Sequence, residues 1–209
     1  KITPATSDTM LGAASSYQNL GNTDKAIEYY LEALKLAPTN SDIAYYISAL
    51  YAEKEDFANA NIYVQKALTL NKNNKQAQVL NKMLAENQNS TILTNAINLF
   101  DSEKYDESLI ELNKLLASDS KNSYGYYYRA MIYDTKQKYK EALVDYKKAI
   151  SMNPDLVIIN YLIGVDYDML EDYKNAISYY KSFLAVYTED DDYKKYAENR
   201  VGELQAYVK

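Results

Sequence analysis

The sequence predicts an all-α fold of antiparallel helix pairs stacked one on the next. The main observation is a 34-residue period, because residues of matching size return at fixed places along the chain, and a period of this length is typical of helical repeat proteins. Within each period, apolar residues follow the spacing of one helix face, as Tyr126, Ala130 and Tyr133 do at i, i+4 and i+7. The period is carried in order by Tyr17, Ala26, Tyr30 and Ala33, by Tyr51, Ala60, Val64 and Ala67, by Tyr133, Ala142, Tyr146 and Ala149, and by Tyr167, Ala176, Tyr180 and Phe183.

The period divides the chain into two blocks. The first block, residues 1–88, is expected to hold two repeats and an extra helix, and the second, residues 89–209, three repeats and a terminal helix that covers the last pair. Pro38 and Pro154 end two of the repeats, because proline cannot donate a helical hydrogen bond. In chain order the expected elements are repeats 7–40 and 41–74, the extra helix 75–88, repeats 89–122, 123–156 and 157–190, and the terminal helix 191–209.

Small residues occupy the eighth and twentieth positions of every repeat. We expect them to let the two helices of each pair approach closely, while the large residues around them fill the gaps between pairs. The eighth positions are Ala14, Ser48, Ala96, Ala130 and Gly164, and the twentieth positions are Ala26, Ala60, Ser108, Ala142 and Ala176.

The extra helix leaves two interpretations open. Apolar residues such as Leu80 and Leu84 share one helix face over residues 75–86. This helix either ends there as a cap on the first block or continues into residues 89–100 as one long helix. The polar, turn-prone run 87–91 favours a break between the two.

The terminal helix is expected to follow an acidic run, residues 188–192. Acidic side chains favour the positive end of a helix, and Thr188 is a candidate for its N-cap. A metal site is disfavoured at this run, because no glycine-turned calcium loop surrounds the carboxylates. We therefore expect no metal here.

These residues and their spacing resemble the tetratricopeptide repeat family, over roughly residues 7–190. The family pattern has small residues at positions 8, 20 and 27, tyrosine at 11, an aromatic residue at 24 and proline at 32. Repeats four and five match most of these positions. Three residues depart from the pattern: Asn95 replaces an apolar residue at position 7, Leu115 replaces the small residue at 27, and Lys72 replaces the proline at 32. The resemblance implies a right-handed superhelical solenoid that serves as a binding surface for other proteins.

The composition argues against several classes of function. The 209 residues include no histidine and no cysteine, so the usual catalytic triads, thiolate metal sites and disulfides are excluded, and the five glycines form no phosphate-binding loop. No apolar run approaches the roughly 20 residues that a membrane-spanning helix needs. A net charge of −6 repels phosphate backbones. We therefore expect no enzyme activity, no cofactor, no nucleic acid partner and no membrane span.

The sequence leaves the cellular location open. The segment 2–7 has no apolar leader, so the cytoplasm is slightly favoured, while an exported form stays open if a leader was removed before Lys1. Heavy use of tyrosine, asparagine and lysine suggests a prokaryotic protein.

The family resemblance also implies a binding site. In this family ligands usually lie along the concave face, lined by first-helix positions 2, 5, 9, 12 and 13, and in the second block these positions are apolar and aromatic with aspartates at the edge. Such a surface fits an apolar or basic peptide or helix. Tyr127 and Tyr161 either contact this ligand or are exposed without a role in binding. The candidate groove residues are Leu93, Ile97, Phe100, Asp101, Tyr124, Tyr127, Met131, Asp134, Ile158, Tyr161, Val165, Asp168 and Met169.

Two functions follow from this surface. The first is a non-catalytic scaffold or adaptor that binds a protein or peptide in the groove. The alternative is a self-assembling structural protein that forms homo-oligomers through its groove and its terminal helix, with Tyr193, Tyr196 and Tyr207 as contacts.

Overall fold

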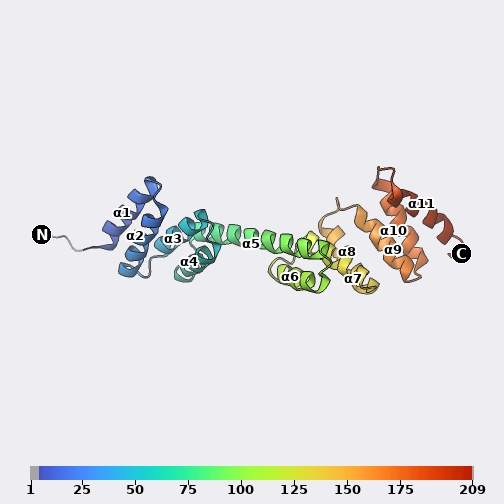
Figure 1. Ribbon diagram of the computed structural model, residues 1–209, viewed down its shortest axis with the longest axis horizontal. Helices are drawn as coiled ribbons and strands as arrows, with labels where there is room; N and C mark the ends of the chain where they lie inside the picture. Colours follow the sequence, from blue (N-terminus) through green and yellow to red (C-terminus); the bar gives the residue numbers. More distant parts are fainter. Residues whose placement is uncertain (1–4, 209) are drawn as a thin grey trace. The chain divides into compact units, whose positions relative to one another are not determined.

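The computed structural model describes residues 5–208, which form eleven helices and no strand (Figure 1). This confirms the all-α fold class. None of these helices is both long and apolar enough to cross a membrane. The sequence before residue 5, where we found no apolar leader, lies outside the described residues. The helices are α1 (Ser7–Asn19), α2 (Thr23–Leu36), α3 (Ser41–Glu53), α4 (Phe57–Leu70), α5 (Lys75–Asp101), α6 (Tyr105–Ser118), α7 (Ser123–Thr135), α8 (Tyr139–Met152), α9 (Ile158–Met169), α10 (Tyr173–Val186) and α11 (Asp192–Leu204).

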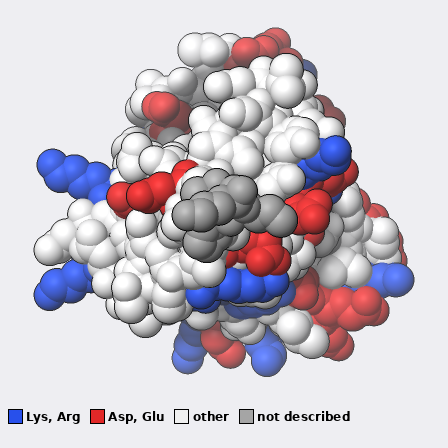
Figure 2. Space-filling model, turned by 90° about the vertical axis from the view of Figure 1, so that its left-hand side faces the viewer, with Lys and Arg blue, Asp and Glu red and all other residues white. Residues whose placement is uncertain are grey.

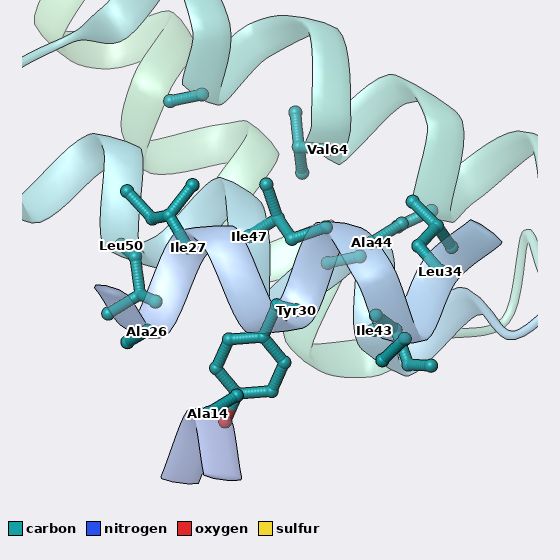
Figure 3. Packing of buried hydrophobic residues seen from close by; sticks show 14 of the residues in the cluster. Ala14, Ala26, Ile27, Tyr30, Leu34, Ile43, Ala44, Ile47, Leu50 and Val64 are labelled. Atoms are coloured by element: carbon teal, nitrogen blue, oxygen red, sulfur yellow. The ribbon is translucent and has the colours of Figure 1, made fainter. Parts of the chain in front are cut away.

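The chain folds as two compact units, Lys1–Gln88 and Asn89–Lys209. In the first unit α1 pairs with α2 and α3 with α4, and α2 packs on α3. The period supplies the core of this unit. Ala14 and Ala26 have no exposed surface, and Tyr30 turns its ring toward Ala14 (Figure 3).

The second unit repeats this arrangement. Here α7 pairs with α8 and α9 with α10, while α6 packs on α7, α8 on α9 and α10 on α11. Tyr146, Tyr180 and Phe183 are its largest fully buried side chains. A buried ion pair links α7 to α8, because Arg129 donates two hydrogen bonds to the Asp145 carboxylate, at 2.6 and 3.0 Å.

The small positions of the period bring the helices of a pair into contact, as predicted. The Ser48 hydroxyl donates to the Ala60 carbonyl at 2.6 Å, and the Ser108 hydroxyl donates to the Ala96 carbonyl at 2.8 Å. Both bonds join position 8 to position 20 of one repeat. At Gly164 the approach is closer still, since a Cβ atom there would lie 2.7 Å from the ring of Tyr180.

The preferred break at residues 87–91 is wrong, because α5 is one helix of 27 residues. Its first part contributes Leu84 to the core of the first unit, and its last part contributes Ala96 to the second. Neither glycine nor proline occurs between these residues. Polar residues there cost only a few tenths of a kcal/mol each in an exposed helix, less than ending one helix and nucleating another.

Thr188 does not cap the terminal helix. Asp191 does, because its carboxylate accepts hydrogen bonds from the backbone N–H groups of Tyr193 at 3.0 Å and Lys194 at 3.2 Å. The Tyr187 hydroxyl donates to the other oxygen of Asp191 at 2.5 Å. The acidic run holds several residues able to cap a helix, and the hydrogen bond from Tyr187 selects the fourth.

Every repeat turns between its two helices at position 15, where the backbone is left-handed. The φ angles at this position lie between 58° and 71°. Glycine adopts such angles freely, whereas other residues pay a steric cost at Cβ. The five residues are Gly21, Glu55, Glu103, Gln137 and Glu171.

Candidate functional site

The predicted groove residues come from three helices of the second unit. Asp101, Tyr124 and Met169 are exposed, Asp168 is buried, and the others are half-buried. The residues are Leu93, Ile97, Phe100 and Asp101 on α5, Tyr124, Tyr127, Met131 and Asp134 on α7, and Ile158, Tyr161, Val165, Asp168 and Met169 on α9.

Packing against the core positions most of the apolar lining. Leu93 and Phe100 lie against one core cluster, Tyr127, Met131 and Ile158 against a second, and Tyr161 and Val165 against a third. Aromatic contacts link the first two groups. Tyr128 meets the Phe100 ring with centroids 5.6 Å apart and the Tyr127 ring with centroids 5.2 Å apart.

Acidic side chains outnumber basic ones in the second unit. This unit carries 15 basic and 20 acidic side chains, against 8 and 9 in the first. Figure 2 views the left-hand side of Figure 1, where the helices of the first unit lie, and shows acidic and basic side chains interspersed there. The excess of negative charge in the second unit makes its surroundings weakly attractive to positive groups.

The terminal helix contacts the predicted groove within this unit. The Tyr161 ring is met edge-on by Tyr193 at 5.1 Å and by Tyr196 at 5.8 Å between centroids. Burial, and then the neighbouring Tyr196 and Tyr193, raise the pKa of the Tyr161 phenol to about 12. Tyr193 also lies close enough to Tyr127 to raise its pKa, although burial has the larger effect. Two tyrosines of α11 therefore belong to the site.

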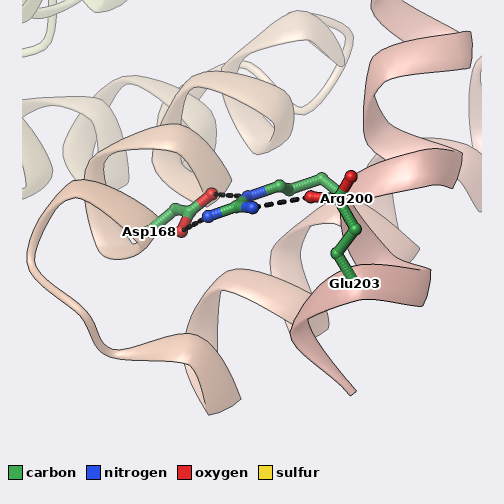
Figure 4. A network of polar contacts seen from close by, with 3 residues as sticks. All are labelled: Asp168, Arg200 and Glu203. Atoms are coloured by element: carbon green, nitrogen blue, oxygen red, sulfur yellow. Dashed lines mark hydrogen bonds and ion pairs between the residues drawn. The ribbon is translucent and has the colours of Figure 1, made fainter. Parts of the chain in front are cut away.

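Asp168 is held by the same helix. The Arg200 guanidinium donates to both oxygens of the buried Asp168 carboxylate, at 2.5 and 2.9 Å, and to Glu203 at 2.7 Å (Figure 4). Hydrogen bonds to Asp168 and Glu203 hold the pKa of Arg200 above its usual range. The negative charge of Asp168 is thus already neutralised within the chain.

Asp134 has a different neighbour. Its carboxyl lies within hydrogen-bonding reach of Asp166 on α9, a residue with no exposed surface. Burial, and then the charge and hydrogen bond of Asp134, raise the pKa of Asp166 well above that of an ordinary carboxyl. Burial also raises the pKa of Asp134, while the hydrogen bond with Asp166 lowers it. Two like charges this close oppose each other's ionisation, which favours the protonated form of the buried Asp166.

The hydroxyl of Tyr146 completes this polar cluster. It is fully buried beside Asp134 and Asp166, whose charges raise its pKa after the larger effect of burial, and it has no hydrogen-bond partner. In repeat one the equivalent hydroxyl is satisfied, since Tyr30 donates to Gln18 at 3.2 Å. The cluster in repeat four thus holds buried polar atoms that are incompletely paired.

Sequence reasoning identified Asp134 and Asp168 but missed the residues that face them. Asp166 and Arg200 stand 34 residues apart, so both occupy position 10 of the period that follows each aspartate. Extending the period into the terminal helix would have found this equivalence. Among residues 5–208, no three acidic side chains gather as a metal-binding group.

Comparisons with known proteins agree with the fold. The family model for the tetratricopeptide repeat matches residues 10–40 and 123–156. No curated protein matches the chain in sequence.

Solved structures of similar fold contain the same repeat. The tetratricopeptide repeat domain of OM64 from Arabidopsis is 16% identical, with a TM-score of 0.53 over 57% of this chain and 98% of that one. The first such domain of Spaghetti (RPAP3), bound to the HSP90 peptide SRMEEVD, is 19% identical, with a TM-score of 0.51 over 57% of this chain and 92% of that one. The domain of P58(IPK) is 19% identical, with a TM-score of 0.49, and 97% of this chain spans 56% of it.

The family assignment rests on agreement between the chain's own period and these matches. The two matched segments are repeats one and four, which hold the helix pairs α1–α2 and α7–α8. The same pairing recurs as α3–α4 in repeat two and as α9–α10 in repeat five. The chain therefore contains tetratricopeptide repeats, which the family model matches at residues 10–40 and 123–156.

Proposed function

We propose that the chain is a non-catalytic scaffold that binds an apolar or basic segment of a partner protein along α5, α7 and α9 of the second unit. The observation that carries this proposal is the lining itself. Ten of the thirteen predicted residues are apolar or aromatic, and the other three are the aspartates Asp101, Asp134 and Asp168. Apolar area supplies the affinity of such a surface, and the aspartates favour positive charge.

The partner's chemistry differs from that of one similar structure. The RPAP3 domain is bound to SRMEEVD, a peptide with three acidic residues. In the present chain, aspartates stand in the lining and no lysine or arginine is among the thirteen residues. A peptide of that kind would meet like charge here, so we expect it to bind weakly.

Tyrosines are the contacts most suited to the partner. They combine a large apolar ring with a polar tip and lose little rotamer entropy on binding. Tyr127 and Tyr161 lie on different helices, and Tyr193 contributes a third ring from α11. A partner segment crossing α7 and α9 would contact all three rings.

A double substitution tests this groove. The full chain serves as bait to recover a partner, whose affinity is then measured for the variant Tyr127→Ala/Tyr161→Ala. We expect binding at least about tenfold weaker, as for paired interface tyrosines. The matched control is Tyr167→Ala/Tyr179→Ala, which removes a stacked pair in the same unit outside the lining. Equal loss in both variants, or no loss in the first, would reject the groove.

Self-assembly is the second candidate, and one observation favours it. Tyr193, Tyr196 and Tyr207 are 49%, 45% and 70% exposed, and exposed aromatic side chains that lie together can form a contact between copies. Light scattering over a wide concentration range decides between the two. A mass that grows with concentration supports self-assembly, and a monomer throughout rejects it.

A further inference from the structure

The second unit has two similar contacts between first helices of successive periods, here called junctions. The first junction joins α7 to α9 and the second joins α9 to α11, and the two differ in the charge of the facing side chains. At each junction, position 12 of one repeat holds an aspartate, Asp134 or Asp168. The residue facing it stands 32 residues further on, at position 10 of the following period. That residue is Arg200 at the second junction and Asp166 at the first.

At the second junction the negative charge of Asp168 is paired with the positive charge of Arg200. Arg200 places two parallel N–H donors on the two oxygens of Asp168, the arrangement that guanidinium and carboxylate groups favour. The first junction has the carboxylate but no cation. Within the described part of the chain, no lysine or arginine forms an ion pair with Asp134 or Asp166.

The first junction also holds buried polar atoms without partners. Apart from the contact with Asp134, neither oxygen of Asp166 has a hydrogen bond, and Asp166 has no exposed surface. The Tyr146 hydroxyl is also buried and unpartnered, as is the Tyr180 hydroxyl at the same position of the second junction. The Asp166 oxygens are therefore what distinguishes the first junction from the second. Buried polar groups are normally satisfied, so an incomplete set marks a place where a ligand group fits.

We propose that Asp134, Asp166 and the hydroxyl of Tyr146 form a subsite for the guanidinium group of an arginine in the partner segment. The partner's arginine would supply at the first junction what Arg200 supplies at the second. This inference rests on the proposed groove, and it specifies the basic residue that the groove receives.

The geometry provides a route to the subsite. Asp134 is half-buried and lies two helical turns from Tyr127 on the same face of α7, so a side chain entering along the lining reaches Asp134 first. Asp166 lies beneath it on α9, and Tyr146 faces both from α8. Tyr127 of α7 lies near Tyr146, and Tyr193 of α11 lies near Tyr127.

Guanidinium fits better than the ammonium of lysine. Its planar fork matches two carboxyl groups side by side, and it is more weakly hydrated, so it enters a buried site at lower cost. Occupation changes the protonation of the pair. A proton held by Asp166 would leave to solvent as the cation arrives, because the cation favours the ionised carboxylate.

A capped amino acid tests the subsite without the unknown partner. We would titrate the full chain with N-acetyl-arginine amide, and with its citrulline analogue as the uncharged isostere, by calorimetry at neutral pH in two buffers of different ionisation enthalpy. We expect saturable binding of the arginine compound with release of about one proton. Equal binding of both compounds, arginine binding without proton release, or preference for Mg²⁺ or Ca²⁺ over arginine would overturn the proposal.

Three variants sharpen this test. Asp166→Asn should weaken arginine binding at least about tenfold and abolish proton release. Asp166→Arg copies the second junction, so it should fill the subsite internally, abolish binding and raise the unfolding temperature. Asp155→Asn, which removes one exposed negative charge after α8, should bind as the parent does. Equal weakening by Asp155→Asn and Asp166→Asn would show a general charge effect and overturn the subsite.

The two proposals fail separately. If the tyrosine variants lose the partner but capped arginine does not bind, the groove stands and the subsite is rejected. If capped arginine binds as expected but the tyrosine variants keep the partner, the subsite stands as a cation site and the groove is rejected. Thermal unfolding of each variant checks that it folds.

Discussion

The two junctions of the second unit have the same frame but different electrostatics. Each has an aspartate at position 12, a tyrosine at position 24 and a following helix packed alongside. At the second junction an arginine from α11 pairs with the Asp168 carboxylate. At the first junction Asp134 faces a second carboxyl group instead of a cation. The comparison shows that packing in a repeat protein is set by the period, while the charges placed on that packing vary from one junction to the next.

The largest effect is expected from breaking the complete junction. Arg200→Met leaves the Asp168 carboxylate buried without its cation, which should lower the free energy of unfolding by about 2–3 kcal/mol. Urea denaturation measures this change. Arg200→Lys retains the charge but not the paired donors, so it should recover only part of the loss. A loss as large in Arg200→Lys as in Arg200→Met would show that the fork geometry, not the charge, holds Asp168.

Close packing at the same junction gives the next effect. Gly164→Ala places a Cβ atom 2.7 Å from the Tyr180 ring, so it should destabilise the chain by about 1–3 kcal/mol. Gly202→Ala on α11 is the matched control, because no atom lies within 4 Å of its added methyl group. The control should be neutral or stabilising. Thermal unfolding compares the two, and equal behaviour would contradict the packing account of position 8.

The incomplete junction should respond to pH. The pKa of Asp166 is raised in the folded chain, so the folded state binds protons more tightly than the unfolded one. Stability from this residue is therefore present below the pKa of an unfolded carboxyl, about 4, and is lost as pH rises through neutrality. Asp166→Asn removes the titrating group and should flatten the fall in unfolding temperature between acidic and alkaline buffer. An unchanged slope would mean that Asp166 does not hold the proton.

The smallest effect concerns the turns that precede the second helices. Gln137→Gly relieves a left-handed backbone at φ 59° and should stabilise the chain by up to about 1 kcal/mol, after the greater freedom of glycine in the unfolded state is subtracted. Gly21→Ala, at the same position of repeat one, should destabilise by a similar amount. Chemical denaturation of both variants tests whether position 15 behaves alike in the two units.

Much of the fold followed from the period. The small residues at positions 8 and 20 predicted the close helix pairs that Ser48 and Ser108 now bridge by hydrogen bonds. The break at residues 87–91 was mispredicted, because turn-prone polar residues are also tolerated in an exposed helix, and tertiary packing on either side decides. The cap at Asp191 depended on a tyrosine hydroxyl that no local pattern reveals.

The site was less predictable than the fold. The family resemblance indicated which faces of α5, α7 and α9 to consider, but it did not show that Asp168 is neutralised by Arg200 or that Tyr161 lies against Tyr193. Those contacts join residues about 32 positions apart through side-chain rotamers, which periodicity does not determine. The sequence pattern does not distinguish Asp166 from a surface carboxylate, and its burial becomes visible only in the packing of α9 on α8.

Arg200 has a consequence for engineering. The terminal helix α11 packs on α10 as α9 packs on α8, and Arg200 stands one period after Asp166. The terminal helix therefore takes the place that the first helix of a further repeat would occupy. A designer could graft residues 191–204 behind another tetratricopeptide array that carries aspartate at position 12. The grafted helix would supply the arginine that pairs with this aspartate. An array with aspartate at position 12 would therefore bind the grafted helix more tightly than an array without it.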